Sequence, residues 1–176
     1  MTRARFLKLR ARDAADLAVI AACLQDALVR PRDMTFLAGE RRFAFVANRF
    51  RWEAAAAGGR PDEAPVPADA GDAEFREAEA QRAAYERIHC GVCFDRVRAV
   101  KTRGLAQGRN PEFLELLTIH AKDGAILLVF AGDAMVRLEV DAIRCHLDDL
   151  GEPWPTAWRP DHPLELSEKP DGKEPA

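Results

Sequence analysis

The segment from residue 112 to 140, EFLELLTIHAKDGAILLVFAGDAMVRLEV, limits the possible folds more than any other part of the chain. Runs of strand-favouring residues in it are separated by Asp123-Gly124 and Gly132-Asp133. Asp-Gly between alternating apolar runs is a strong local signal for a tight hairpin, because both turn positions accept a positive φ. The pattern therefore predicts three consecutive antiparallel strands.

Further strands are predicted before this meander. Residues 6–11 alternate in polarity, residues 33–53 form a hairpin that turns at Gly39-Glu40, and residues 87–104 form one long strand. Consecutive hairpins imply an antiparallel sheet, and a twisted sheet of about seven strands tends to curl.

Two amphipathic helices are predicted to pack against this sheet. The first is capped by Asp13 and ends at Pro31, and the second covers residues 141–150, with Asp141 as its N-cap and Gly151 as its terminator. The predicted fold class is therefore α+β, an antiparallel meander curled into a roll or partial barrel with two packing helices. A pleckstrin-homology-like barrel is the alternative.

The composition divides the chain into a folded body and two acidic appendages. At 176 residues the chain has the length of a single domain, which we predict at residues 1–160. Residues 54–72 are rich in Ala, Gly, Pro and Asp and predict a disordered insertion, and residues 161–176 predict a mostly disordered tail. Without residues 54–86 and 161–176, 16 acids stand against 21 bases, so the predicted body carries about +5.

No feature of the sequence predicts a membrane protein or a secreted protein. The longest uninterrupted apolar run, Ala125 to Ala131, is too short to span a bilayer, and no signal peptide is recognisable at the N-terminus. Four cysteines without a secretory signal favour reduced thiols, so we predict a cytoplasmic location.

The stretch HCGVC suggests specific chemistry, because Cys90 and Cys93 stand three residues apart beside His89. A zinc knuckle needs a turn that brings both sulfurs to one metal ion, which Gly91 could permit. In an extended strand, however, residues three apart point to opposite faces. We therefore predict that Cys90 and Cys93 diverge, and keep a metal site at Cys90, Cys93 and His89 as the alternative.

Catalytic patterns are not found in this sequence. The one serine, Ser167, lies in the predicted tail, and neither a Gly-x-Ser-x-Gly motif nor a glycine-rich phosphate loop occurs. Asp148 and Asp149 could act as paired carboxylates, but a solvated helix end explains them more simply. These observations favour a protein that is not an enzyme and carries no cofactor.

Basic residues are concentrated in two of the predicted strand regions. The hairpin carries Arg41, Arg42, Arg49 and Arg51, and the long strand carries Arg87, Arg96, Arg98, Lys101 and Arg103. If those strands are neighbours, their outward side chains form a basic ribbon that could bind a protein or an anionic ligand. The alternative is a solvated face whose charges pair with nearby acids. The predicted ligand-binding residues are Arg42, Arg49, Arg51, Arg96, Arg98 and Arg103.

Four stretches carry a resemblance to a known family: LKLRARDAADLAVIAACLQDALV, RRFAFVANRFRWE, FDRVRAVKTRG and LVFAGDAMVRLEVDAIRCHLDDLG, the last followed by a tryptophan and RPDHP. In these stretches the chain resembles the uncharacterised alphaproteobacterial domain-of-unknown-function family 2948. The resemblance implies a bacterial cytoplasmic protein and brings no activity, cofactor or catalytic residue.

The sequence thus predicts a non-enzymatic binding or adaptor module that contacts a protein or anionic ligand through a basic sheet face. A nucleic-acid-associated protein that uses the same arginines is the alternative, followed by a Cys/His metalloprotein. The sequence does not predict the oligomeric state.

Overall fold

One antiparallel sheet of nine strands dominates the computed structural model, which describes residues 6–57, 85–105, 111–156 and 159–160. The strands are β1 (Lys8–Ala11), β2 (Ala27–Leu37), β3 (Arg42–Phe50), β4 (Tyr85–Asp95), β5 (Val97–Arg103), β6 (Leu114–Lys122), β7 (Ala125–Phe130), β8 (Met135–Val140) and β9 (Cys145–Thr156). The helices are α1 (Ala14–Cys23), α2 (Trp52–Ala57) and a 3₁₀ turn, η1 (Ala38–Glu40).

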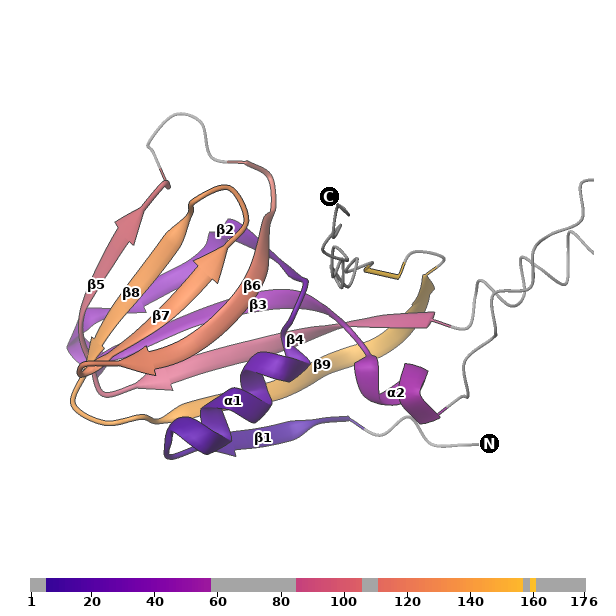
Figure 1. Cartoon of the computed structure of the whole chain (residues 1–176), viewed down its shortest axis with the longest axis horizontal. Coiled ribbons are helices and arrows are strands. Elements are labelled where there is room, and N and C mark those ends of the chain that lie inside the picture. The colour runs from indigo at the N-terminus through magenta and orange to yellow at the C-terminus, as the bar shows by residue number, and fades with distance from the viewer. Residues whose placement is uncertain (1–5, 58–84, 106–110, 157–158, 161–176) are drawn as a thin grey trace, which may run out of the picture.

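The strand order, β1-β9-β4-β3-β2-β6-β7-β8-β5, is that of a sheet folded over on itself. β2 joins the two halves, but it pairs with β6 only from Ala27 to Val29. Figure 1 shows β6, β7, β8 and β5 in front, with β3, β4 and β9 behind them. The α+β class and the curled meander are confirmed; the sheet does not close into a barrel.

Side chains from both halves of the sheet meet in one apolar core. Alternate residues of β3 and β4 point inward, as do those of β7 and β8, so each strand contributes every second side chain. The largest fully buried apolar side chains include Phe94, Phe130, Leu116, Ile126, Leu128 and Leu138.

Helix α1 packs between the edge strand β1 and β6. Asp13 is its N-cap, as predicted, and the Asp13 carboxylate accepts a hydrogen bond of 2.8 Å from the backbone N–H of Asp16. The side chains of Leu17 and Ile20 in the helix, and of Leu24 at its C-cap, are buried in the core. The helix ends at Cys23 and not near Pro31, because Asp26 adopts a positive φ of 60° and the chain continues as β2.

The predicted helix over residues 141–150 is wrong. Residues 145–156 form β9, which pairs with β1 on one side and with β4 on the other. Ile143 and Leu147 are four residues apart, a spacing that suits one face of a helix and also one face of a strand. The segment forms a strand because it makes backbone hydrogen bonds to both β1 and β4.

The predicted long strand over residues 87–104 is broken in two. Arg96 has a φ of 65°, which turns the chain by a corner between β4 and β5. The two strands consequently lie in different halves of the sheet, with β4 beside β3 and β5 at the far edge beside β8.

A buried ion-pair network joins β3, β9 and α2. The side chain of Arg49 is 0% exposed and donates from Nε and Nη2 to the two carboxylate oxygens of Asp149, at 2.8 and 2.7 Å. Arg49 also donates to Glu53 in α2. Burial opposes its charge, but the hydrogen bonds to Asp149 and Glu53 raise the pKa of Arg49 above its usual range. Asp149 also accepts from the N–H of Leu7, just before β1.

Two further arginines are buried near this network. Arg51 pairs with Glu86, and its backbone N–H donates to the Glu86 carbonyl at 2.9 Å. Arg87 donates from Nε to the Asn48 side chain at 2.7 Å. The chain therefore leaves the sheet after β3 and returns to it at β4 at one point, where both strand ends are held together.

The predicted insertion at 54–72 starts within α2, which contains residues 54–57. Its remaining residues lie outside the described part of the chain, as do residues 161–176.

We expect Asp149→Ala to lower the free energy of unfolding by about 3–5 kcal/mol, because it leaves the Arg49 charge buried without its partner. Urea unfolding followed by circular dichroism measures this loss. Asp148→Ala is the matched control: Asp148 is the preceding residue but is exposed, and we expect a change within about 0.5 kcal/mol. Equal effects of the two substitutions would contradict the structural role of the network.

Replacement of residues 58–84 by a Gly-Ser linker of about ten residues should leave the fold intact, because shortening a loop of this size changes its closure entropy by only about 1 kcal/mol. For a chain of this length we expect a Tm shift of about 2–4 °C, measured by calorimetry. A loss of cooperative unfolding would show that residues 58–84 form part of the folded core.

Candidate anion-binding end of the roll

The structure distributes the six predicted ligand-binding arginines over three environments. Arg49 and Arg51 do not face solvent: their side chains are 0% and 8% exposed and are ion-paired inside the protein. An outward ribbon containing them is therefore wrong: Arg49 and Phe50 point to opposite faces of β3 and both are fully buried, so the end of this strand is buried on both faces. Arg103 lies exposed at the far end of β5.

The other three predicted arginines, Arg42, Arg96 and Arg98, lie close to one another. They reach the same end of the roll because three chain connections meet there: the β2–β3 turn, the β4–β5 corner and the β8–β9 connection. Backbone hydrogen bonds join these connections, from Val97 N–H to the Arg41 carbonyl and from Asp141 N–H to the Arg96 carbonyl.

Two arginines outside the six predicted ligand-binding residues complete this group: Arg41, which belongs to the predicted basic ribbon, and Arg144, which the sequence reasoning missed. Arg41 follows η1, and Arg144 precedes β9, where its carbonyl accepts from the N–H of Asp95 at 2.9 Å. Arg144 carries no local signal, since it is placed by a pairing between distant parts of the chain. We call the five exposed or half-exposed residues the arginine end: Arg41, Arg42, Arg96, Arg98 and Arg144.

Carboxylates neutralise part of the arginine end. Asp141 pairs with both Arg41 and Arg98, and the hydrogen bond from Arg41 holds the pKa of Asp141 below its usual range. Arg42 donates from Nε to Asp95 at 2.8 Å. In the described ranges, no carboxylate lies within ion-pair distance of Arg96 or Arg144. The arginine end therefore has positive charge in excess.

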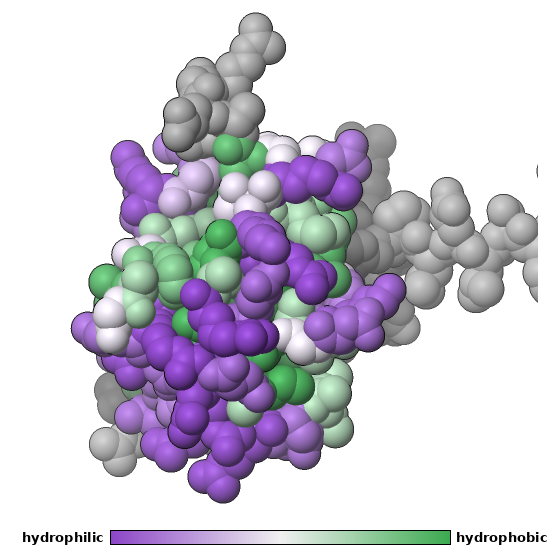
Figure 2. Space-filling view, turned by 90° about the vertical axis from the view of Figure 1, so that its left-hand side faces the viewer, coloured by the Kyte–Doolittle hydropathy of each residue, from purple (hydrophilic) through white to green (hydrophobic). Residues whose placement is uncertain are grey.

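Figure 2 views the roll from the side on which these connections lie, and hydrophilic side chains cover most of the lower part of that view. An apolar hollow lies beside the arginine end on the outer face of β3, β4 and β9. Its volume is about 350 Å³, and it is lined by Val46, Gly91, Cys93, His146 and Leu150 among others. His146 stands 3.6 Å from Asp95, the partner of Arg42, so the hollow borders the arginine end.

The outer face of the sheet around this hollow carries exposed apolar groups. Val46 and Leu150 are 39% and 46% exposed. Gly91 between them has no side chain, and a Cβ atom there would lie 3.6 Å from the Leu150 methyl group. The surface next to the arginines can therefore make apolar contacts as well as ionic ones.

The cysteines are arranged as a strand requires. Cys90 is fully buried in the core and pairs in register with Asp149 and Ala47, whereas Cys93 is half-buried on the outer face. The predicted divergence of the two thiols is confirmed. His89 shares the outer face with Cys93 but lies four residues away along an extended strand, about 13 Å. The His89 ring contacts Trp154, with 4.7 Å between ring centroids.

The other candidate groups are also separated. Cys145 is buried, while His146 points to the outer face, and Asp149 is buried while Asp148 is exposed. Over the residues that the structure describes, no three His, Cys, Asp or Glu side chains are grouped so that they could hold a metal ion.

Comparison with protein families gives one match. Residues 7–162 match the family described as "Protein of unknown function (DUF2948)". The chain belongs to this family, as the resemblance predicted. No curated protein and no solved structure matches the chain. None of the helices in the described ranges is long and apolar enough to cross a membrane.

We expect thiol-specific reagents to separate the cysteines of this DUF2948 protein by burial. Burial raises the pKa of Cys90 to about 12 and also raises the pKa of Cys145, so both stay protonated and shielded at pH 8. Ellman's reagent should therefore modify only Cys93 and Cys23 in the native protein, and all four thiols in urea. Cys93→Ser should remove one of the native equivalents; fast native modification of Cys90 would contradict the strand geometry.

Proposed function

We propose that this protein is a non-enzymatic binding module that contacts an acidic protein partner or another anionic ligand through the arginine end. The observation that carries the proposal is the meeting of five arginines from three distant connections at one corner, where backbone hydrogen bonds join these connections. A guanidinium group binds carboxylates and phosphates through two parallel hydrogen bonds, which suits recognition better than solubility alone.

A protein partner is favoured by the apolar hollow beside the arginines. Protein interfaces combine an apolar centre with arginine and a polar rim, and the hollow offers Val46 and Leu150 on the outer face and borders the arginine end at His146. Binding of a nucleic acid would favour aromatic side chains between the arginines, because nucleobases stack on aromatic rings. The aromatic cluster of Phe50, Trp52 and Tyr85 instead surrounds the start of β4, away from the β4–β5 corner.

A binding role is favoured over catalysis because the carboxylate of Asp149 is ion-paired and the four cysteine thiols have raised pKa values. The buried carboxylate of Asp149 is fully engaged with Arg49, and burial raises the pKa of each of the four thiols. These groups stabilise the fold in their present arrangement. We also propose that the protein acts in a bacterial cytoplasm, which is consistent with four free cysteines.

The proposal is tested with the double variant Arg96→Gln/Arg144→Gln. Removal of two unpaired charges should weaken binding to heparin and to a poly-glutamate peptide, with elution at lower salt and a smaller salt dependence. The matched control is Arg32→Gln/Arg159→Gln, which removes the same charge from exposed positions away from the arginine end. Elution is measured on a heparin column, and affinity by fluorescence anisotropy.

Equal retention of the two double variants would mean that only net charge matters and would reject the arginine end as a site. Retention on single-stranded DNA without binding to poly-glutamate would favour the nucleic-acid alternative.

A further inference from the structure

Two of the strand edges that lack a partner in the described residues, those of β5 and β2, lie near one another. In the described residues, β5 is the last strand of the sheet and pairs only with β8, and β2 has no partner on its second side after Val29. The N–H of Val97, at the start of β5, donates to the carbonyl of Arg41 at 2.9 Å. The free edge of β5 therefore faces the turn between β2 and β3. Figure 1 shows both strands extending from this corner, β5 in front and β2 behind.

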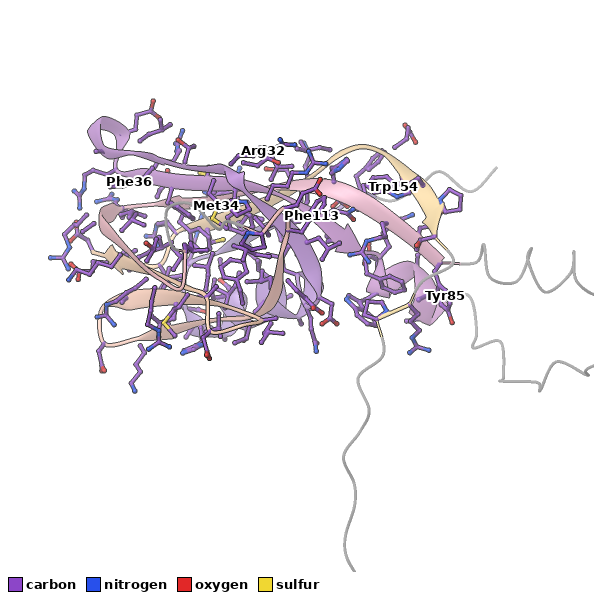
Figure 3. The ribbon with its side chains drawn as sticks, turned by 90° about the horizontal axis from the view of Figure 1, so that it is seen from above. Arg32, Met34, Phe36, Tyr85, Phe113 and Trp154 are labelled. Atoms are coloured by element: carbon purple, nitrogen blue, oxygen red, sulfur yellow. The ribbon has the colours of Figure 1, made fainter. Side chains whose placement is uncertain are left out.

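Unpaired strand edges offer rows of backbone N–H and carbonyl groups, and proteins generally protect them or use them to bind an extended segment. Figure 3 shows the labelled Met34 and Phe36 along β2, at the opposite end from the labelled Tyr85 and Trp154. Met34, Phe36 and Val100 are only partly buried, although all three pack against the core. An added strand could cover them with its inward side chains.

The outward side chains of β5 specify the charge of such a segment. Val100 and Thr102 pair with the buried Leu138 and Val136, so they share the inner face. Lys101 and Arg103 alternate with them and are exposed, and Arg98 is 56% exposed. Like charges would repel a second copy of β5, whereas acidic residues on a segment would pair with these bases.

The carboxylates of β8 and the β8–β9 connection neutralise this edge only in part. Glu139 in β8 is shared between Lys101, at 2.7 Å, and Arg137, at 4.0 Å, while Asp141 is shared between Arg41 and Arg98. Arg103 has no carboxylate partner in the described ranges. Positive charge therefore continues from the arginine end along β5.

From this arrangement we infer that the free edge of β5 binds an extended partner segment in which apolar and acidic residues alternate, added to the sheet as a further strand. This inference rests on the proposed function and names its partner: a protein segment, with its acidic side chains on Arg98, Lys101 and Arg103 and its apolar side chains on Val100, Met34 and Phe36. The backbone bonds supply affinity, and the alternation supplies specificity.

The test uses the full chain and a labelled peptide of alternating glutamate and valine, seven residues long. Two control peptides have the same side chains but carry N-methyl groups either on every valine or on every glutamate. In a strand, alternate N–H groups point to opposite sides, so only one of the two methylated sets should face β5. We expect one methylated peptide to bind at least about tenfold more weakly and the other to bind like the parent.

Substitutions in the protein locate the site. Lys101→Glu/Arg103→Glu should weaken parent-peptide binding by at least about tenfold, whereas Arg159→Glu, at an exposed position away from β5, should not. Amide exchange should slow along Val97–Arg103 when the parent peptide is bound.

The other outcomes separate the two proposals. Equal binding of all three peptides that is still weakened by Arg96→Gln/Arg144→Gln would overturn strand addition and leave the arginine end as an anion site. No binding of any acidic peptide would overturn both. Binding that appears only after removal of residues 161–176 would assign the edge to the chain's own tail and overturn its assignment to a partner.

Discussion

The pair of Arg49 and Asp149 is the interaction on which the arrangement of this protein depends. It joins β3 to β9 inside the roll. The two hydrogen bonds run from Nε and Nη2 of Arg49 to the carboxylate oxygens of Asp149, at 2.8 and 2.7 Å, and neither side chain is exposed. The Asp149 carboxylate also accepts a hydrogen bond from the backbone N–H of Leu7, and Arg49 also donates to Glu53. One buried pair thereby holds the N-terminal segment, the last strand and the start of α2 in a fixed relation. A buried charge pair tolerates few alternative registers, because a shift would leave both charges without partners.

The same constraint separates the interior arginines from those available to a partner. Arg49, Arg51 and Arg87 stabilise the region where β3 ends and β4 begins, at which the chain leaves the sheet and returns to it. The arginine end lies at the opposite tips of β3 and β4, where Arg42 pairs with Asp95 and the chain turns at Arg96. The buried arginines therefore stabilise the fold, whereas the exposed arginines are available to a partner. Burial distinguishes the two groups.

Local signals in the sequence were sufficient for the central hairpins but not for β9. Asp123-Gly124 and Gly132-Asp133 both adopt positive φ angles, so turn chemistry predicted β6 to β8 correctly. β9 was mistaken for a helix because its apolar spacing suits both periods and its pairing partners lie in β1 and β4. Of the arginine end, Arg42, Arg96 and Arg98 are predicted ligand-binding residues and Arg41 belongs to the predicted basic ribbon, whereas Arg144 is not predicted. The contact between Arg41 and Asp141 has no local signal, because the two residues are 100 positions apart. The burial of Arg49 was missed for the same reason, since its partner Asp149 is equally distant in sequence.

The position of β9 between β1 and β4 also affects how the protein forms during synthesis. β1 is made before the other described strands, yet its register partners, Cys145 to Asp148, lie in β9, the last of these strands to be made. Until then, the Arg49 side chain has no Asp149 to bind, and one edge of β4 has no neighbour. The pairings of β6 with β7 and of β7 with β8, by contrast, are local and can form early. The N-terminal half of the chain must therefore wait for the C-terminal strand, so a nascent chain that stops before residue 145 has no complete fold to adopt.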